Sequence, residues 1–240
     1  MATVAELFTI IITDYLDNGS GTAKDLWDHA FLFRALNEAQ EQACNRTNII
    51  YDDSAAAITK INLVNGTATY KLDQRITVVD HVMFDSIKCT HVSKEEIEKG
   101  TPGWRALTGM TGKTIQYVIR GRTIRFVPSP NIDDAGKKVY LEVFRRPLDT
   151  LSDCSDSPEI PEEYHRSLIY WVLHEAYRKQ DADTFNQERA DYFLNKFNEI
   201  FGEYISAEIR VNNFEQPISM MLHGHNYTPT LTRDSQEDWI

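Results

Sequence analysis

Hydrophobic periodicity changes twice along this chain of 240 residues, and these changes limit the folds that it can adopt. Residues 26–46 place apolar side chains at three- and four-residue steps, which is typical of an amphipathic helix. Residues 57–150 contain short alternating apolar runs between turn residues, which indicates strands. Helical spacing returns at 161–180 and at about 183–206. The order of helices, strands and helices predicts an α+β fold.

The expected helices have recognisable starts and stops. Asp25 is a candidate N-cap for the helix at 26–46, because an aspartate side chain can accept hydrogen bonds from the first turn. A shorter helix at 4–17 is expected to end in the turn-forming run NGSG. Pro161 suits the first turn of a later helix, since its missing N–H would have no partner there.

The middle segment predicts two hairpins. Asn65-Gly66, between AITKINLV and TATYKL, is typical of a type I′ turn. A second hairpin is expected to form from TIQYVIR and TIRFVP, with its turn around Gly121. The remaining expected elements are strands in 75–84 and 137–147 and a short helix in 93–100.

Charge divides the chain at the same places. Residues 1–56 carry 3 basic and 9 acidic groups, residues 57–150 carry 15 and 10, and residues 151–240 carry 7 and 17. The middle segment is therefore basic, with a net charge of +5, between segments of −6 and −10. Surfaces of opposite sign suit contacts with different partners.

These patterns predict a domain organisation. Residues 1–56 and 151–212 are expected to form a helical bundle domain. Residues 57–150 are expected to form a β-rich, sandwich-like insertion, and residues 213–240 an extended C-terminal tail.

Composition excludes some protein classes. No apolar run approaches the roughly 20 residues of a membrane-spanning helix, so no membrane contact is expected. The run LFTIII is too short for a signal peptide and is flanked by Glu6 and Asp14. Cys44, Cys89 and Cys154 are odd in number and far apart, which favours an intracellular protein without a disulfide framework.

One stretch, DSPEIPEEYHRSLIYWVLHEAYRKQD, resembles a metal-binding helix. A zinc-protease motif requires His-Glu-x-x-His, and His174-Glu175 supplies its first half, but Arg178 occupies the second histidine position. His165 lies nine residues before His174, which places it half a turn away on the helix and roughly 13 Å along it. The apolar run LIYWVL indicates a core helix instead.

Three other motifs also have simpler structural interpretations. GMTGKT at 109–114 lacks the first glycine of a phosphate-binding loop, where Leu107 stands, and precedes a strand instead of a helix. His223-Gly224-His225 has no supporting ligand nearby. An aromatic stripe indicates a buried helix face, and it consists of Phe193, Phe197, Phe201 and Tyr204. No catalytic residue, cofactor site or metal site is expected.

Arg120, Arg122 and Arg125 are the candidate partner-facing residues of the second hairpin. With Tyr117 and Phe126 they place basic and aromatic side chains together, a combination that can touch phosphates. A solvated face or an interface to an acidic partner is the simpler interpretation. The acidic chain as a whole argues against tight DNA binding.

The chain resembles the head-to-tail adaptor proteins of tailed phages, of the short-tailed type related to tail tubular protein A. The resemblance covers most of residues 25–202. It rests on Leu32 to Ala39 in the first long helix, on Pro158 and Pro161, and on the aromatic helix after Asp183.

This resemblance implies a structural virion protein at the head–tail junction, made in the host cytoplasm. It implies a ring, commonly of twelve copies, that docks on the portal, contacts nozzle, tube or fibre-attachment proteins of the tail, and surrounds DNA without sequence-specific binding. The C-terminal extension would then reach the portal. Its candidate portal-binding residues are Tyr227, Leu231, Trp239 and Ile240.

Two other functions remain open at this point. One is a tail-completion or tail-terminator protein that assembles on the tail tube instead of the portal. The other is a metal-dependent hydrolase that would use His165, His174, or the pair His223 and His225.

Overall fold

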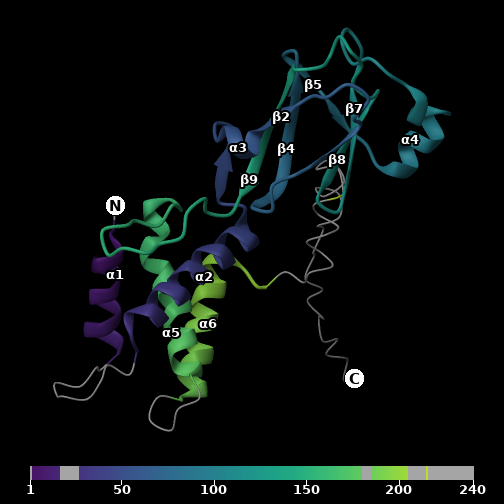
Figure 1. The fold of residues 1–240 in the computed structure, drawn as a ribbon. Coiled ribbons are helices and arrows are strands. Elements are labelled where there is room, and N and C mark those ends of the chain that lie inside the picture. The colour runs from purple at the N-terminus through teal and green to yellow at the C-terminus, as the bar shows by residue number, and fades with distance from the viewer. Residues whose placement is uncertain (1, 17–26, 180–184, 205–214, 216–240) are drawn as a thin grey trace, which may run out of the picture.

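The computed structural model describes residues 2–16, 27–179, 185–204 and 215. Within these residues the structure has two sheets and six α-helices (Figure 1). The fold is therefore mixed α+β, the class that the periodicity predicts. The α-helices are α1 (Val4–Ile10), α2 (His29–Thr47), α3 (Ala56–Thr59), α4 (Lys94–Gly100), α5 (Leu168–Arg178) and α6 (Gln187–Phe201). A π-helical segment and two 3-10 segments accompany them, η1 (Ile11–Tyr15), η2 (Trp104–Ala106) and η3 (Glu162–Ser167).

The strands form one five-stranded and one four-stranded sheet. In the first sheet the order is β1 (Ile50–Asp52), β9 (Lys138–Arg145), β4 (Ile76–Phe84) and β5 (Ile87–Lys88), and β2 (Lys60–Asn62) also pairs with β9. In the second sheet the order is β3 (Thr69–Lys71), β8 (Thr123–Val127), β7 (Gln116–Arg120) and β6 (Thr90–His91). Only the β6–β7 pair is parallel among these ladders.

Side-chain caps define where the helices begin. Thr3 and Glu6 form a reciprocal capping box at the start of α1. The N-cap of α2 is Asp28, whose Oδ1 accepts a hydrogen bond of 2.7 Å from the Phe31 N–H. The sequence placed this cap at Asp25, which lies outside the described residues. None of the helices in the described ranges has the length and apolar character that crossing a bilayer requires.

The helix beginning near residue 161 is shorter and less regular than expected. Pro161 is the N-cap of η3, and α-helical geometry starts only at Leu168. The chain therefore enters the helix through a 3-10 segment, as is frequent at the N-termini of α-helices.

The helices α1, α2, α5 and α6 share one hydrophobic core and lie together at the lower left of Figure 1. Their buried residues come from both ends of the chain, from Val4 to Ile50 and from Leu151 to Phe201. The largest fully buried side chains in this cluster are Leu7, Ile11, Leu16, Leu32, Leu36, Phe197 and Phe201.

Arg46 links the end of α2 to the end of α6. Its guanidinium carbon lies 5.4 Å from the Trp171 ring centroid and 5.0 Å from that of Phe197. The same group donates hydrogen bonds to the Asn198 side chain at 2.7 Å and to the Gly202 carbonyl at 2.9 Å. The last turn of α6 is therefore fixed to α2 by a charged side chain.

The two sheets share a second cluster of buried residues. Val79 and Leu141 from the first sheet and Ile119 and Phe126 from the second belong to it. A third cluster connects the second sheet with α4 and η2, and it contains Ile97, Trp104, Val118 and Val127. Side chains of β7 and β8 alternate between these two clusters, as the period of two along a strand requires.

The prediction of a β-hairpin at Asn65-Gly66 is wrong, because the two strands that flank this turn do not pair with each other. A turn does form there, with Gly66 at a φ of 75°, but β2 before it pairs with β9 while β3 after it pairs with β8. The chain thus crosses from one sheet to the other at this turn. A local turn signal fixes the reversal of the chain but not the strand to which each arm pairs.

The other β elements agree with the sequence. Strands β7 and β8 form the hairpin around Gly121 with antiparallel register from Gln116↔Val127 to Arg120↔Thr123. Strands β4 and β9 lie within the two expected runs, and α4 ends at Gly100 as expected.

A buried arginine joins the first sheet to the helices. Arg145, the last residue of β9, donates from Nε to Asp52 and from a terminal nitrogen to Glu159 at 2.6 Å. The side chains of Arg145 and Asp52 are only 7% and 4% exposed. Glu159 also accepts from the Leu148 N–H, and its own N–H donates to the Gln40 side chain of α2.

The Asp52 carboxylate is stabilised in its charged form. Burial by itself would raise the pKa of Asp52, but hydrogen bonds from the N–H groups of Ala55 and Ser54 and from Arg145 outweigh it and lower the pKa to about 2. The pKa of Asp52 is lower in the folded than in the unfolded chain. The charged carboxylate therefore stabilises the fold at pH values above its ordinary pKa near 4, and this stabilisation is lost as the pH falls through about 2.

We expect Arg145→Met to lower the free energy of unfolding by about 3–5 kcal/mol, because it leaves Asp52 charged, buried and without its cation. Chemical denaturation of the full chain measures this change. The matched control is Lys196→Met, which removes an exposed i,i+3 pair with Glu199 and should cost less than about 1 kcal/mol. Equal effects of the two substitutions would contradict the role of Arg145.

Candidate functional site

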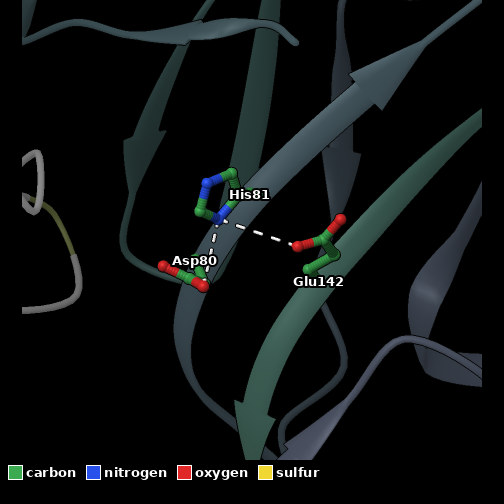
Figure 2. Close-up of side chains that lie close together, drawn as sticks. All are labelled: Asp80, His81 and Glu142. Atoms are coloured by element: carbon green, nitrogen blue, oxygen red, sulfur yellow. Dashed lines mark ion pairs between the residues drawn. The ribbon is translucent and has the colours of Figure 1, made fainter. Parts of the chain in front are cut away.

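A bulge in β4 brings three potential metal ligands together on the first sheet. The register between β4 and β9 shifts between Val79 and His81, so the side chains of Asp80 and His81 no longer point to opposite faces. His81 lies opposite Glu142 of β9 in the ladder. Figure 2 shows the three side chains converging from these two strands.

The three ligand atoms are close but are not joined by regular hydrogen bonds. His81 Nδ1 lies 3.0 Å from a carboxylate oxygen of Asp80 and 3.7 Å from one of Glu142. That nitrogen is inaccessible to solvent, and within the described residues it has no partner in acceptable hydrogen-bond geometry. The ligand atoms all lie within 4.8 Å of one another.

A tyrosine holds the third ligand in place. The Tyr51 hydroxyl of β1 donates to Glu142 Oε2 at 3.0 Å, and this hydrogen bond is the main reason that the pKa of Tyr51 rises to about 12. The Tyr51 ring also packs edge-on against Phe144, with centroids 5.7 Å apart. Imidazole nitrogen and carboxylate oxygen in this arrangement are able to bind a divalent cation.

The sequence predicts no metal site, and it does not single out these three residues. The only local signal is the Asp-His pair inside RITVVDHVMF, and in a regular strand those two side chains would lie on opposite faces. Glu142 is 61 residues further on, and neither the bulge nor the register that pairs it with His81 is visible in the sequence.

The histidines of the helical stretch have structural hydrogen bonds. His165 is fully buried, with Nε2 2.8 Å from the Ile160 carbonyl oxygen. His174 is 5% exposed and its Nδ1 lies 2.8 Å from the Ala190 carbonyl oxygen of α6. Both are packed in the helical core, in agreement with the prediction of a core helix.

The loop that resembles a phosphate-binding motif holds a carboxylate of its own chain. The buried Asp134 accepts from the N–H groups of Met110 and Thr111 at 2.8 and 3.1 Å, and from the Thr111 hydroxyl at 2.6 Å. Burial opposes the charge of Asp134, but these bonds outweigh it and lower its pKa. The N–H groups that a phosphate would need are therefore already used, and the loop is the predicted turn before a strand.

The three arginines of the second hairpin have different surroundings. Arg120 and Arg122 are exposed at the turn, and Arg122 donates to the Ile76 carbonyl of the other sheet. Arg125 is half-buried, with its guanidinium carbon 5.1 Å from the Trp104 ring centroid. The structure brings them to one hairpin without forming a single arginine cluster.

The aromatic stripe is buried only in part. Phe193, Phe197 and Phe201 are at most 7% exposed, whereas Tyr204 is 60% exposed and this part of the prediction is wrong. The reason is that α6 ends at Phe201, and Gly202, with a φ of 78°, turns the chain away from the helical line.

The remaining candidate residues from the sequence lie outside the part of the chain that the structure describes. They are His223, His225, Tyr227, Leu231, Trp239 and Ile240.

The chain matches the family model of the SU10 adaptor protein over residues 2–220. This match covers nearly the whole sequence, and the chain belongs to that family. The finding confirms the resemblance to phage head-to-tail adaptors. Membership implies a structural adaptor role as a virion component and contact with portal and tail components in general. No curated protein matches the chain at a significant level.

We expect His165→Gln and His174→Gln to lower the free energy of unfolding by about 1–3 kcal/mol, since each leaves a buried carbonyl without its partner. Any such variant that stays folded should still support virion assembly, because neither side chain is assigned to chemistry. Denaturation and complementation of a phage lacking the protein measure the two effects. His29→Gln is the exposed control and should change stability by less than about 0.5 kcal/mol. Loss of assembly in a variant with a normal melt would contradict this expectation.

Proposed function

We propose that this protein forms a ring, of about twelve copies, that docks on the portal and connects it to the tail around the DNA channel. The observation that carries the proposal is the family match, which spans both the helical and the β-rich parts of the chain. The number of copies follows the resemblance to head-to-tail adaptors described above. Binding to a tail tube in place of the portal is the alternative that the experiments below distinguish.

The proposed architecture has two domains and a tail. Residues 1–56 and 151–212 form a helical bundle that builds the ring wall, residues 57–150 form a sandwich-like insertion, and residues 213–240 form the tail. The separate clusters of buried residues support this division, because the first draws on both ends of the chain and the second on the middle. Each cluster is large enough to act as the core of a domain.

Charge supports different roles for the two parts. The two helical segments are acidic, with net charges of −6 and −10, whereas the insertion carries +5. An acidic ring wall would repel the DNA backbone, so DNA would pass through the ring without binding to it. The basic insertion would face tail components, with Arg120, Arg122 and Arg125 toward an acidic partner.

The C-terminal tail is the proposed portal contact. Tyr227, Leu231, Trp239 and Ile240 are apolar residues in a stretch that also contains prolines, and large aromatic side chains are frequent binding anchors. Several tails that engage one portal ring would gain affinity by multivalency, which offsets the cost of ordering each tail.

Truncation after Asn212 tests this contact. We expect a folded, soluble protein that no longer co-sediments with portal-bearing capsids, while the full chain does. Truncation also removes Glu215, whose Oε1 accepts from the Gly121 N–H at 2.7 Å. The control is therefore full-length Glu215→Ala, which should fold and bind portal normally, since one exposed hydrogen bond contributes only about 1 kcal/mol. Binding of the truncated chain at the level of the full chain would show that the tail is not the portal contact.

We also expect the isolated protein to be mostly monomeric in moderate salt. Acidic subunits repel one another, and a ring must also overcome the loss of rotational freedom on assembly, so it needs the portal as a template. Light scattering of the purified protein with and without portal measures this. A stable ring without portal would contradict the expectation, and a ring on isolated tail tubes would favour the alternative.

A further inference from the structure

We propose that Asp80, His81 and Glu142 bind a divalent transition-metal ion, and that Zn²⁺ is the ion that this ligand set fits best. This site lies on a partly exposed face of the first sheet and is independent of the adaptor role. Its three side chains come from β4 and β9, the two longest strands in the described part of the chain.

The spacing of the ligand atoms fits one ion. Zinc binds histidine nitrogen and carboxylate oxygen at about 2.0–2.2 Å, so neighbouring ligands of a tetrahedral ion lie about 3.4 Å apart. His81 Nδ1 lies 3.0 Å from Asp80 and 3.7 Å from Glu142, on either side of that value. The three ligand atoms all lie within 4.8 Å of one another, and Figure 2 shows their side chains grouped around the same space.

A hydrogen bond from Nδ1 of His81 to Asp80 or Glu142 would occupy the nitrogen that a metal ion needs. Within the described residues, Nδ1 of His81 has no such bond, although it is shielded from solvent and an Asp80 oxygen lies 3.0 Å away. An imidazole nitrogen between two carboxylate oxygens is a ligand arrangement that suits a divalent cation such as zinc.

The ligand types select the class of ion. Mg²⁺ and Ca²⁺ prefer oxygen ligands alone, whereas an imidazole with carboxylates suits zinc and similar ions. The side chains of His81 and Glu142 are each 35% exposed, so water can complete the coordination. Tyr51 supports the site from outside, because its hydroxyl donates a hydrogen bond to Glu142 and such bonds orient the ligands at metal centres.

A bound ion would tie β4 to β9 at the bulge. The ladder is irregular there, between Val79 and His81, and a metal bridge from Asp80 and His81 to Glu142 would compensate for the pairing lost. Since only the folded chain presents the three ligands together, binding should raise the melting temperature.

Calorimetric titration of the metal-free, full-length protein with Zn²⁺ tests the proposal. The tail pair His223 and His225 is a competing site, so a His223→Gln, His225→Gln double variant serves as the parent. We expect this parent to bind one Zn²⁺ and to melt at a higher temperature in its presence, with no comparable response to Mg²⁺. Co²⁺ should give visible absorption typical of nitrogen and oxygen ligands.

Substitutions in the parent then locate the ion. His81→Gln and Glu142→Gln should each weaken Zn²⁺ binding about 100-fold or more and abolish the thermal shift, and Tyr51→Phe should weaken it about 10-fold. His81 and Glu142 lie on a partly exposed sheet face, so both variants should fold, and circular dichroism verifies this for each. The proposal is overturned if the parent binds no Zn²⁺, or if both folded variants bind it as the parent does.

Discussion

The ion pairs of Arg145 are the interaction on which the arrangement of the described parts depends. This one side chain ends β9, neutralises the buried Asp52 of β1 and holds Glu159, whose N–H contacts Gln40 of α2. A hydrophobic contact could bury the same volume, but it would not fix an angle between a sheet and a helix. Arginine suits this task because its planar group donates in several set directions. The β-rich part is thereby attached to the helices by directional bonds as well as by chain connectivity.

The sequence predicted elements better than it predicted their pairing. Apolar spacing located α2, β4, β9 and the β7–β8 hairpin, because burial on one face of an element imposes its period on the residues. It failed at Asn65-Gly66, where the turn exists but its two arms enter different sheets. Which strand a segment joins depends on contacts distant in sequence, and no local pattern records them.

The same limit applies to the candidate metal site. His165 and His174 lie in a stretch that resembles a metal-binding motif, yet both are hydrogen-bonded to backbone carbonyls inside the helical core. Asp80, His81 and Glu142 stand in ordinary strands, and only a bulge and a strand register bring them together. Asp134 gives a further example, since a distant carboxylate occupies the loop that resembles an anion site. Potential ligands are thus brought together here by strand register, which the local sequence does not record.

The fixing of α6 by Arg46 has a mechanical consequence. A helix under tension at its C-terminal end normally yields from the last turn, one hydrogen bond at a time. Here the Gly202 carbonyl and the Asn198 side chain are both bonded to Arg46 of α2, whose guanidinium also lies over Trp171 and Phe197. A force applied beyond Gly202 would have to break the contacts of Arg46 before the last turn of α6 could unwind. The C-terminal end of α6 should therefore resist unwinding by force more than a helix end without such contacts.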